Sequence, residues 1–403
     1  MIKIIAIITS EIGSGGGFDQ SLNAIVQMQR LSINRFRFEV CTTHKSNISI
    51  CRRLGIQAMP IEISILDRIL SNLSQNIFWQ TVQWRLKLIG PLEKTLLRYG
   101  CDVVYFLTPE NLCSSLQKLN YINTLWDLCH RETPEFPEVR DFNAFYIREN
   151  NSRHNFGPAL VTLTDSTLLA DMSARFYGVD RRRFIAMPFS PAPFMDKMHA
   201  ISNTKIIKKY SLETGYFYYP AQLWPHKNHI RILQALKILR DEQAFKPNVV
   251  FSGKDYGNRA HIENFIQTNQ LESQVKILGF VPSADMRGLY ENAIAIVMPT
   301  YFGPTNLPPL EAWSIGVPLI YSAQLIEQTG NAALLVDPDN AIELAEAMLQ
   351  CTKSEIRDRL IRAGHQRLAE IADQRISAEE EICKILEKFA ARRECWGNND
   401  LTT

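Results

Sequence analysis

The amino-acid sequence predicts an α/β protein with two doubly wound, Rossmann-like parallel sheets. Short apolar runs recur along both halves of the chain, and each is followed by a loop and a helical pattern. The run from Lys3 to Thr9 is typical of a central parallel strand, which is buried on both faces. At 403 residues the chain has room for about two domains. We expect an N-terminal domain over 1–200, a C-terminal domain over 201–375, and over 376–403 a helix that returns to the N-terminal domain, then a polar tail.

The N-terminal half alternates strands and helices up to a proline-rich stretch. Ser166 follows an apolar run and is a suitable N-cap for the next helix. The stretch 188–193 is extended and proline-rich, so we place the domain boundary at about 190–210. Further strands are expected over 101–107, 121–125, 160–163 and 184–187, helices over 19–31 and 166–177, and a helical pattern over 61–99.

The C-terminal half repeats this alternation. Ser283 is expected to cap a helix in its middle. The expected strands cover 216–219, 248–252, 275–278, 293–298, 318–321 and 333–336, and the expected helices cover 230–240, 341–351 and about 377–393.

Composition excludes several classes of protein. The formal net charge is +2, which gives no reason to expect a nucleic-acid partner. The first residues lack the pattern of a signal peptide, and no apolar run is long enough to span a membrane. Eight cysteines without a Cys-x-x-Cys pair are typical of a reduced compartment. A cytoplasmic protein without a zinc site is therefore expected.

A glycine loop follows the first strand. Gly15, Gly16 and Gly17 would let the backbone approach a ligand closely. The loop does not fit the dinucleotide fingerprint, because Phe18 stands where the third glycine is required and no acidic residue ends the second strand. We therefore expect no nicotinamide cofactor. The alternative is a tight turn that binds nothing.

The stretch PTYFGPTNLPPLEAWSIGVP, residues 299–318, contains the expected anion site. Pro308 and Pro309 fit the first turn of a helix, where the backbone N–H groups have no helical partner. Those N–H groups and the positive end of the helix dipole favour an anion such as a diphosphate. Glu311 lies one turn further and suits the hydroxyls of a sugar. The alternative is an ordinary strand-to-helix turn with a favourable first-turn acid.

Charged residues also follow the expected strand 121–125. Asp127, His130 and Arg131 lie at its carboxyl end, where an open α/β sheet carries its site. A salt bridge within the loop is the alternative.

An aromatic and basic segment lies within 61–99. Phe78, Trp79 and Trp84 interleave with basic residues, as in a helix that docks on an anionic membrane surface. Packing of these aromatics into the core, with solvated lysines and arginines opposite, is the favoured interpretation.

Three motifs together resemble the retaining glycosyltransferases of family 4. They are PAQLWPHKNH, the run VKILGFVPSADMRGLYENAIAIVMPTYFGPTNLPPLEAWSIGVP, and GNAALLVDP, and they cover nearly all of 215–340. In the N-terminal half the resemblance depends on the glycine loop, WDLCHRETPEFPEV and LTDSTLLADMSARFYGV. It implies the GT-B fold, in which two domains face across a cleft. It also implies a nucleotide-sugar donor held by the C-terminal domain and an acceptor held by the N-terminal one.

The resemblance assigns roles to residues around the donor diphosphate. Lys227 matches the diphosphate-binding lysine, while Gln222 stands where relatives carry an arginine. Glu311 matches the second member of the Glu-x7-Glu motif, which binds ribose hydroxyls in relatives. Gly303 replaces the first member, as in a branch of the family with FGPTN-type loops. Backbone N–H groups for the phosphates are implied at residues 305–307, which are Thr305, Asn306 and Leu307.

Other matches surround the nucleotide and the acceptor. Gly253, Lys254 and the backbone around Val281 match the nucleotide pocket. In the N-terminal half Trp126 replaces a histidine that reaches the donor sugar in many relatives. Asp127 and His130 remain to orient the sugar or the acceptor, and Asp127 is the candidate base if the donor phosphate does not take the acceptor's proton.

The expected function is transfer of a hexose or deoxyhexose from a nucleotide diphosphate to a glycan or lipid-linked acceptor in surface polysaccharide synthesis. No Asp-x-Asp metal site is evident, so protein charge would replace a catalytic metal, and no cofactor beyond the donor substrate is expected. The alternatives are an epimerase or phosphorylase of the same fold, and a subunit that binds a nucleotide sugar without catalysis. A peripheral location on the inner face of the membrane is an alternative to a fully cytoplasmic one.

Overall fold

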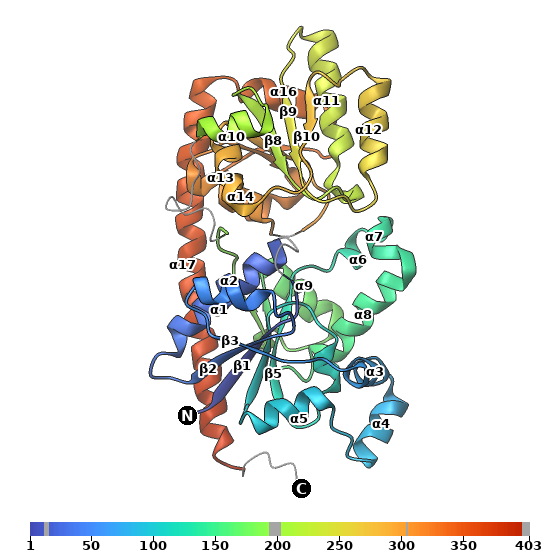
Figure 1. The fold of residues 1–403 in the computed structure, drawn as a ribbon, viewed down its shortest axis with the longest axis vertical. Coiled ribbons are helices and arrows are strands. Elements are labelled where there is room, and N and C mark those ends of the chain that lie inside the picture. Colours follow the sequence, from blue (N-terminus) through green and yellow to red (C-terminus); the bar gives the residue numbers. More distant parts are fainter. Residues whose placement is uncertain (12–15, 193–202, 304, 397–403) are drawn as a thin grey trace. The chain divides into compact units, whose positions relative to one another are not determined.

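A computed structural model describes residues 1–11, 16–192, 203–303 and 305–396 (Figure 1). The chain divides into two compact units. The N-terminal unit contains 1–130, 143–189 and the chain from 373 onward, and the C-terminal unit contains 131–142 and 190–372. Among the described residues, no helix combines the length and apolar character needed to cross a membrane.

The N-terminal unit contains a parallel sheet of seven strands in the order β3-β2-β1-β4-β5-β6-β7. Alternate residues of a strand face opposite sides of the sheet, so each face has its own core. Ile4 packs with α1 (Gly16–Ser32) and the C-terminal helix on one face, and Ile5 packs with α5 (Pro91–Arg98) on the other. The strands are β1 (Lys3–Ile8), β2 (Arg37–Thr42), β3 (Ala58–Pro60), β4 (Val103–Phe106), β5 (Asn120–Leu125), β6 (Val161–Thr164) and β7 (Phe184–Ala186).

The expected helical pattern over 61–99 forms three short helices. Ser64 and Asp67 form a capping box that begins the first. Gly90 and Pro91 begin the third. The helices of the first part of the chain are α1 (Gly16–Ser32), α2 (Asn47–Arg53), α3 (Ile65–Leu73), α4 (Ile77–Arg85), α5 (Pro91–Arg98), α6 (Cys129–Glu132), α7 (Pro137–Arg140), α8 (Ala144–Asn155) and α9 (Thr167–Tyr177).

Two aromatic side chains of α4, Phe78 and Trp79, are not core residues, contrary to the favoured interpretation. Phe78 is 65% exposed and Trp79 is 43% exposed. The side chain of Trp84 lies outside the described residues.

The C-terminal unit contains a parallel sheet of six strands in the order β10-β9-β8-β11-β12-β13. Pro282, not Ser283, is the N-cap of α13, so the expected cap lies one residue too late. The strands are β8 (Tyr216–Pro220), β9 (Val249–Ser252), β10 (Val275–Ile277), β11 (Ala293–Met298), β12 (Leu319–Ser322) and β13 (Leu334–Val336). The helices are α10 (Asn203–Tyr210), α11 (His229–Glu242), α12 (Arg259–Thr268), α13 (Ser283–Glu291), α14 (Leu307–Ile315), α15 (Ile326–Thr329) and α16 (Ala341–Gln350).

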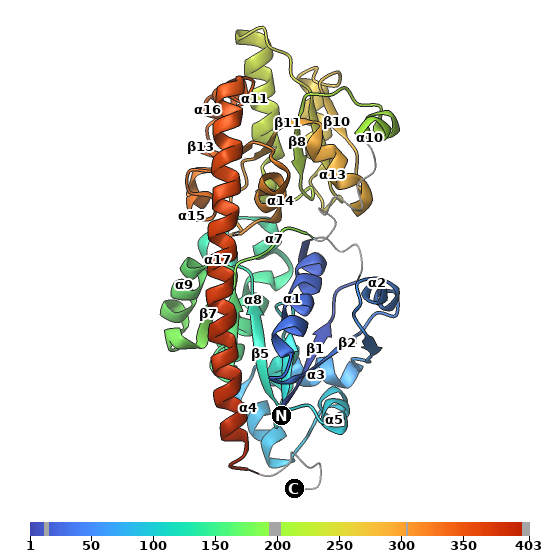
Figure 2. The same cartoon turned by 90° about the vertical axis from the view of Figure 1, so that its left-hand side faces the viewer.

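One long helix, α17 (Ser354–Arg393), ends the described chain (Figure 2). It begins 23 residues before the expected start at 377, since no proline interrupts it. Its first part belongs to the C-terminal unit, where Gly364 lies so close to Trp313 that a Cβ would be 2.4 Å from Cδ1. Its last part belongs to the N-terminal unit, where Gln27 donates to Glu379 at 2.7 Å.

Each sheet has one point at which the order of its strands reverses. In the N-terminal sheet this point lies between β1 and β4, and in the C-terminal sheet between β8 and β11. The connections on either side of such a point leave toward opposite faces, which opens a crevice at the carboxyl ends of the two strands. The loops after β1, β4, β8 and β11 are therefore candidate positions for ligand sites.

Candidate active site

Lys227 lies in the loop after β8, at the reversal point of the C-terminal sheet. Its Nζ donates to Asn306 Oδ1 at 3.1 Å. The short turn around Lys227 is fixed, because Tyr219 Oη donates to the Lys227 carbonyl at 2.9 Å. Asn228 ends this turn in a left-handed conformation, and its side chain donates to the Pro299 carbonyl at 3.0 Å. The loops after β8 and β11 are thus joined by direct hydrogen bonds.

Asn306 precedes the first residue of α14 and is the centre of a buried polar network. Its Nδ2 donates to the Gly303 carbonyl at 2.8 Å and to Tyr321 Oη at 2.7 Å. Tyr321 Oη in turn donates to Gln328 Oε1 at 2.7 Å. Asn306 therefore presents its carboxamide oxygen to Lys227 in a fixed orientation.

The start of α14 offers fewer backbone donors than the sequence predicts. Asn306 N–H donates to Gln328 Oε1 at 2.9 Å, which corrects the expectation that it offers this group to a phosphate. Pro308 and Pro309 carry no N–H, so Leu307 supplies the donor of the first turn. Thr305 lies directly before Asn306, which is the N-cap of α14. The dipole of this nine-residue helix still favours an anion at its start.

Glycine is required at position 303 by the backbone conformation there and by the neighbouring side chain of Asn306. Its φ is +103°, which side chains rarely adopt, and a Cβ would lie 3.0 Å from the Asn306 carboxamide. The Asn306 side chain thus occupies the space next to position 303. Gly303 and Asn306 are coupled features of this loop.

Glu311 is 4% exposed and accepts a hydrogen bond from Tyr290 Oη. Burial, together with the charge of Glu311, raises the pKa of Tyr290 well above its ordinary value, so Tyr290 stays a donor. Glu311 is therefore held one turn into α14 by a neutral phenol.

The loop after β9 contains the residues expected to hold the nucleotide. Gly253 has φ +153°, and a Cβ would lie 2.2 Å from the Ala221 carbonyl oxygen, so only glycine fits. Lys254 Nζ lies 5.2 Å from the centre of the Phe280 ring. Val281 is buried directly after this ring.

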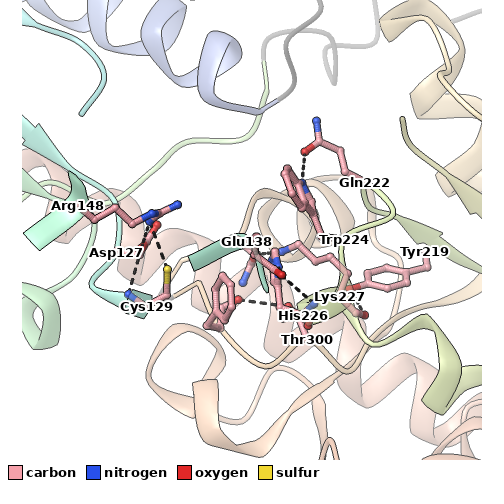
Figure 3. Close-up of polar contacts among 12 residues, drawn as sticks. Asp127, Cys129, Glu138, Arg148, Tyr219, Gln222, Trp224, His226, Lys227 and Thr300 are labelled. Atoms are coloured by element: carbon pink, nitrogen blue, oxygen red, sulfur yellow. Dashed lines mark hydrogen bonds and ion pairs between the residues drawn. The ribbon is translucent and has the colours of Figure 1, made fainter. Parts of the chain in front are cut away.

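Gln222 does not replace the charge of an arginine but orients an aromatic ring. Its Oε1 accepts from Trp224 Nε1 at 3.0 Å (Figure 3). The Trp224 ring stacks on Tyr256 with centroids 4.2 Å apart. A stacked pair of this kind, 39% exposed at Tyr256, is chemically suited to contact a flat base.

Glu138 is a residue of the site that the sequence did not single out. It belongs to α7, and its Oε1 accepts from His226 N–H at 3.0 Å and also contacts His226 Nδ1 (Figure 3). The His226 ring stacks on Phe302 at 3.8 Å, and Phe136 packs on Phe302 at 5.7 Å. The segment 131–142 is thereby attached to the turn that carries Lys227.

These contacts determine the charge of Glu138. Burial alone would raise the pKa of its carboxyl group, but the hydrogen bonds from His226 and from backbone N–H groups lower the pKa below its ordinary value. Glu138 is therefore ionised beside His226.

Asp127 and His130 of the N-terminal unit have different partners. Asp127 forms an ion pair with Arg148 at 2.9 Å and accepts from Cys129 N–H at 3.1 Å (Figure 3). His130 is 1% exposed, and its Nε2 lies 3.2 Å from Glu149 Oε2. Both partners, Arg148 and Glu149, belong to α8, so these ion pairs join the loop to that helix and are not the salt bridge within the loop that was the alternative.

The pKa shifts follow from those partners. Burial would raise the pKa of Asp127, but the charge of Arg148 and the contacts with Cys129 lower it. Burial lowers the pKa of His130 although Glu149 opposes this effect. A strongly ionised Asp127 is better suited to orient a group than to remove a proton.

Of the glycine loop, Gly15 lies outside the described residues, while Gly16 and Gly17 begin α1. A Cβ at Gly17 would lie 2.7 Å from the ring of Trp126. Glycine is therefore needed there so that the helix start can pack against this ring.

The structure brings together Lys227, Gly303, Asn306, Leu307 and Glu311 around two loops of one unit. It adds Glu138, Tyr321 and Gln328 in the same unit and, separately, Arg148 in the N-terminal unit. Sequence motifs did not indicate these residues, because each contacts a partner at least 15 positions away along the chain. Only the proline-rich turn around Glu138 carried a local signal, that of a rigid loop. Among the described residues, no group of three or more His, Cys, Asp or Glu side chains is arranged to hold a metal ion.

Residues 202–367 match the family model of the glycosyl transferases, group 1. The matched residues lie within the C-terminal unit.

Curated relatives match over part of their length. The chain is 30% identical over 153 residues to the O-antigen chain mannosyltransferase B of Escherichia coli, a match that covers 37% of this chain and 40% of the relative. It is 26% identical over 180 residues to the O-antigen chain mannosyltransferase RfbU of Salmonella typhimurium, covering 44% and 47%. The matches therefore span less than half the length of either relative.

Solved structures share the fold over nearly the whole chain. Anabaena Alr3699/HepE, solved in complex with UDP-glucose, superposes with a TM-score of 0.68 at 15% identity and covers 97% of this chain and 100% of its own. The two parallel sheets of this protein with their flanking helices have the GT-B glycosyltransferase fold, as the sequence predicted.

Proposed function

We propose that this protein is a retaining glycosyltransferase that moves a hexose or deoxyhexose from a nucleotide-diphosphate donor to a glycan or lipid-linked acceptor in surface polysaccharide synthesis. The observation that carries the proposal is the position of Lys227, which is held by Asn306 at the reversal point of the C-terminal sheet and next to the start of α14. Ligands of open α/β sheets bind at such points.

The chemistry of sugar transfer explains why a lysine suits this place. When the glycosidic bond breaks, negative charge develops on the diphosphate oxygens that leave with the nucleotide. An ammonium group and a helix dipole that are already oriented stabilise that charge without a reorganisation cost. Lys227 and the start of α14 supply both, so the protein's own charge takes the role that a metal has in other transferases.

Neighbouring groups would bind the rest of the donor. Glu311, which accepts from Tyr290, would accept further hydrogen bonds from ribose hydroxyls, and the stacked Trp224 and Tyr256 would contact the base. Gly253, Lys254 and Val281 would form another part of the nucleotide site. In the N-terminal unit Asp127 and His130 would orient the acceptor, and a donor phosphate oxygen would take its proton in a front-side reaction.

The comparisons support this choice of substrate class. Two partial relatives are named as O-antigen chain mannosyltransferases, and a structural neighbour was solved with UDP-glucose. A hexose donor and a growing surface glycan are therefore the first substrates to test.

The test measures donor binding and transfer separately. Thermal unfolding with UDP, GDP and dTDP identifies the nucleotide, because a ligand that binds only the folded state raises the unfolding midpoint. Transfer is then measured with the matching nucleotide sugars and a panel of lipid-linked acceptors. Lys227→Ala is expected to lower transfer by about 10²–10³-fold with its melting curve unchanged, and the control Lys237→Ala to have little effect.

Near-normal turnover of Lys227→Ala would contradict the mechanism. Tight nucleotide binding without transfer to any acceptor would instead indicate a non-catalytic subunit, and a changed sugar without acceptor would indicate an epimerase.

Exposed aromatics on α4 support a peripheral contact with the membrane. Phe78 and Trp79 project into solvent on a helix whose last turn carries Arg85. The wild type is expected to float with anionic vesicles, and the double variant Phe78→Ala/Trp79→Ala is expected to float less. Unchanged flotation of the double variant would contradict this contact.

A further inference from the structure

The N-terminal unit contains a cavity of about 570 Å³ at the carboxyl ends of its strands. It lies beside the reversal point of the sheet, because its lining includes residues that follow β1, β2 and β4. Its volume is within the range of ordinary ligand sites, roughly 300–1,000 Å³. Its polar lining residues include Thr9, His44, Arg68, Asn72, Glu110 and Asn111.

Glu110 is the most firmly held charged group of this cavity. Its Oε1 accepts from Thr108 Oγ1 at 3.0 Å and from Thr9 Oγ1, so hydroxyls from two neighbouring strand ends fix one carboxylate oxygen. Its backbone carbonyl accepts from Asn155 Nδ2 at 2.9 Å, which fixes the loop itself. A carboxylate oriented in this way is a prepared acceptor of hydrogen bonds.

The other polar groups of the cavity are also ordered. His44 Nε2 lies 3.0 Å from the Thr9 carbonyl oxygen, and Asn111 Nδ2 donates to Asn72 Oδ1 at 2.9 Å. Amide, hydroxyl and carboxylate groups that converge in one cavity match the donors and acceptors of a polyhydroxylated ligand.

The charges of the cavity select against an anionic ligand. Glu62 and Glu110 place two carboxylates in the lining, whereas Arg68 is its one arginine or lysine among the described residues. Arg68 already interacts electrostatically with Glu110. A phosphate group would therefore meet a net negative lining.

Burial opposes the negative charge of Glu110. It raises the pKa of the carboxyl group, whereas the two threonine hydroxyls and the charge of Arg68 lower it. Such a site favours ligands that donate hydrogen bonds over ligands that bring a second negative charge.

We propose that this cavity binds the non-reducing end of the acceptor glycan, that this end is a neutral sugar, and that Glu110 accepts hydrogen bonds from its hydroxyls. That the bound sugar is part of an acceptor rests on the proposed transferase function. The sugar-binding site itself is formed by residues of the N-terminal unit alone.

The test uses the full-length protein and needs no catalytic turnover. Saturation-transfer NMR is recorded with a panel of neutral methyl glycosides (mannoside, glucoside, galactoside and rhamnoside), with mannose 6-phosphate as competitor. At least one glycoside is expected to bind, the phosphate to compete at least tenfold more weakly than the parent sugar, and Glu110→Gln to weaken binding about tenfold or more.

Two further variants keep the test decisive. Glu93→Gln changes another buried glutamate of this unit, which holds the backbone of 117–119, so it controls for lost stability and should retain binding. Asn72→Ala removes an exposed group of the cavity and should weaken binding even if Glu110→Gln does not fold.

The proposal would be overturned if no glycoside bound, if the phosphorylated sugar bound as well as the parent sugar, or if neither cavity variant affected binding. The outcome is separable from that of the proposed function. Sugar binding without transfer from any nucleotide sugar would contradict the transferase and leave the sugar site standing.

Discussion

Lys227 Nζ lies 3.1 Å from Asn306 Oδ1, so the two loops that flank the reversal point of the C-terminal sheet are joined through the side chain of the proposed diphosphate-binding lysine. Asn306 itself is oriented by Gly303 and Tyr321. The lysine is therefore positioned before any donor binds, and this reduces the entropy lost on binding.

Replacing Asn306 tests this positioning. In Asn306→Ala, Lys227 loses the acceptor that holds it, and we expect kcat/KM for the donor to fall about 10–100-fold. The stabilisation of the protein by nucleotide diphosphate should also decrease. Transfer assays and thermal shifts measure the two effects. Asn269→Ala is the matched control, because its side chain caps α12 within the same unit.

An unchanged kcat/KM in Asn306→Ala would show that Lys227 does not depend on this partner.

Gly303 offers a second test, because Gly257 is a matched control. Both residues have φ near +100°, but only Gly303 has a neighbour, the Asn306 carboxamide, at the position of a Cβ. Alanine should cost about 1–2 kcal/mol of stability at either position through backbone strain. Only Gly303→Ala should also reduce transfer, since it displaces Asn306. Melting curves and initial rates of both variants measure this difference.

Equal activity of the two glycine variants would contradict the coupling between Gly303 and Asn306. The same geometry predicts that Gly303→Glu, which restores the first acid of the Glu-x7-Glu motif, lowers activity further.

Local signals explain what could be predicted from the sequence. The apolar runs such as Lys3 to Thr9 determine parallel strands by themselves, and the prolines at 308 and 309 place the start of α14 within two residues. Lys227 was singled out because its motif resembles that of a known family. These features depend on neighbouring residues, so no tertiary information is needed.

The features that were missed depend on partners distant in sequence. Glu138 is 88 positions from His226, and Gln328 is 22 positions from the Asn306 N–H that it occupies. Arg148 is 21 positions from Asp127. Side-chain pairing over such separations follows from the packing of the loops, and no periodicity or spacing in the chain encodes it.

Glu138 is predicted to hold the segment 131–142 against the turn that carries Lys227. Glu138→Gln removes the charge that binds His226 and should destabilise this contact by about 1–3 kcal/mol. Amide hydrogen exchange of 131–142 should become about tenfold faster or more. Glu135→Gln, an exposed acid of the same segment, is the control.

The pH dependence of this contact has a defined sign. Because the folded pKa of Glu138 is lowered, its stabilising contribution is present above the unfolded value of about 4.5 and is lost as the pH falls through the folded value. The difference in exchange between wild type and Glu138→Gln should therefore shrink below pH 4.5. A difference that grows on acidification would exclude an ionised Glu138.

Asp19 is predicted to destabilise the N-terminal unit at neutral and alkaline pH. It lies in the first turn of α1, and burial raises the pKa of its carboxyl group from 3.8 to about 7. The folded state therefore binds more protons than the unfolded state between these values, so stability falls as the pH rises from about 4 to 7. Asp19→Asn removes this cost but also loses a favourable interaction with the helix dipole of about 0.3–1 kcal/mol.

The net gain for Asp19→Asn should be about 1–2 kcal/mol at pH 8, and the unfolding midpoint of the N-terminal unit should rise by roughly 2–6 °C. At pH 5 the gain should be clearly smaller, because most folded molecules then carry a protonated Asp19. Melting curves at both pH values measure the effect, with the exposed Asp358→Asn as control. A gain that is as large at pH 5 as at pH 8 would show that the carboxyl group is not the source of the instability.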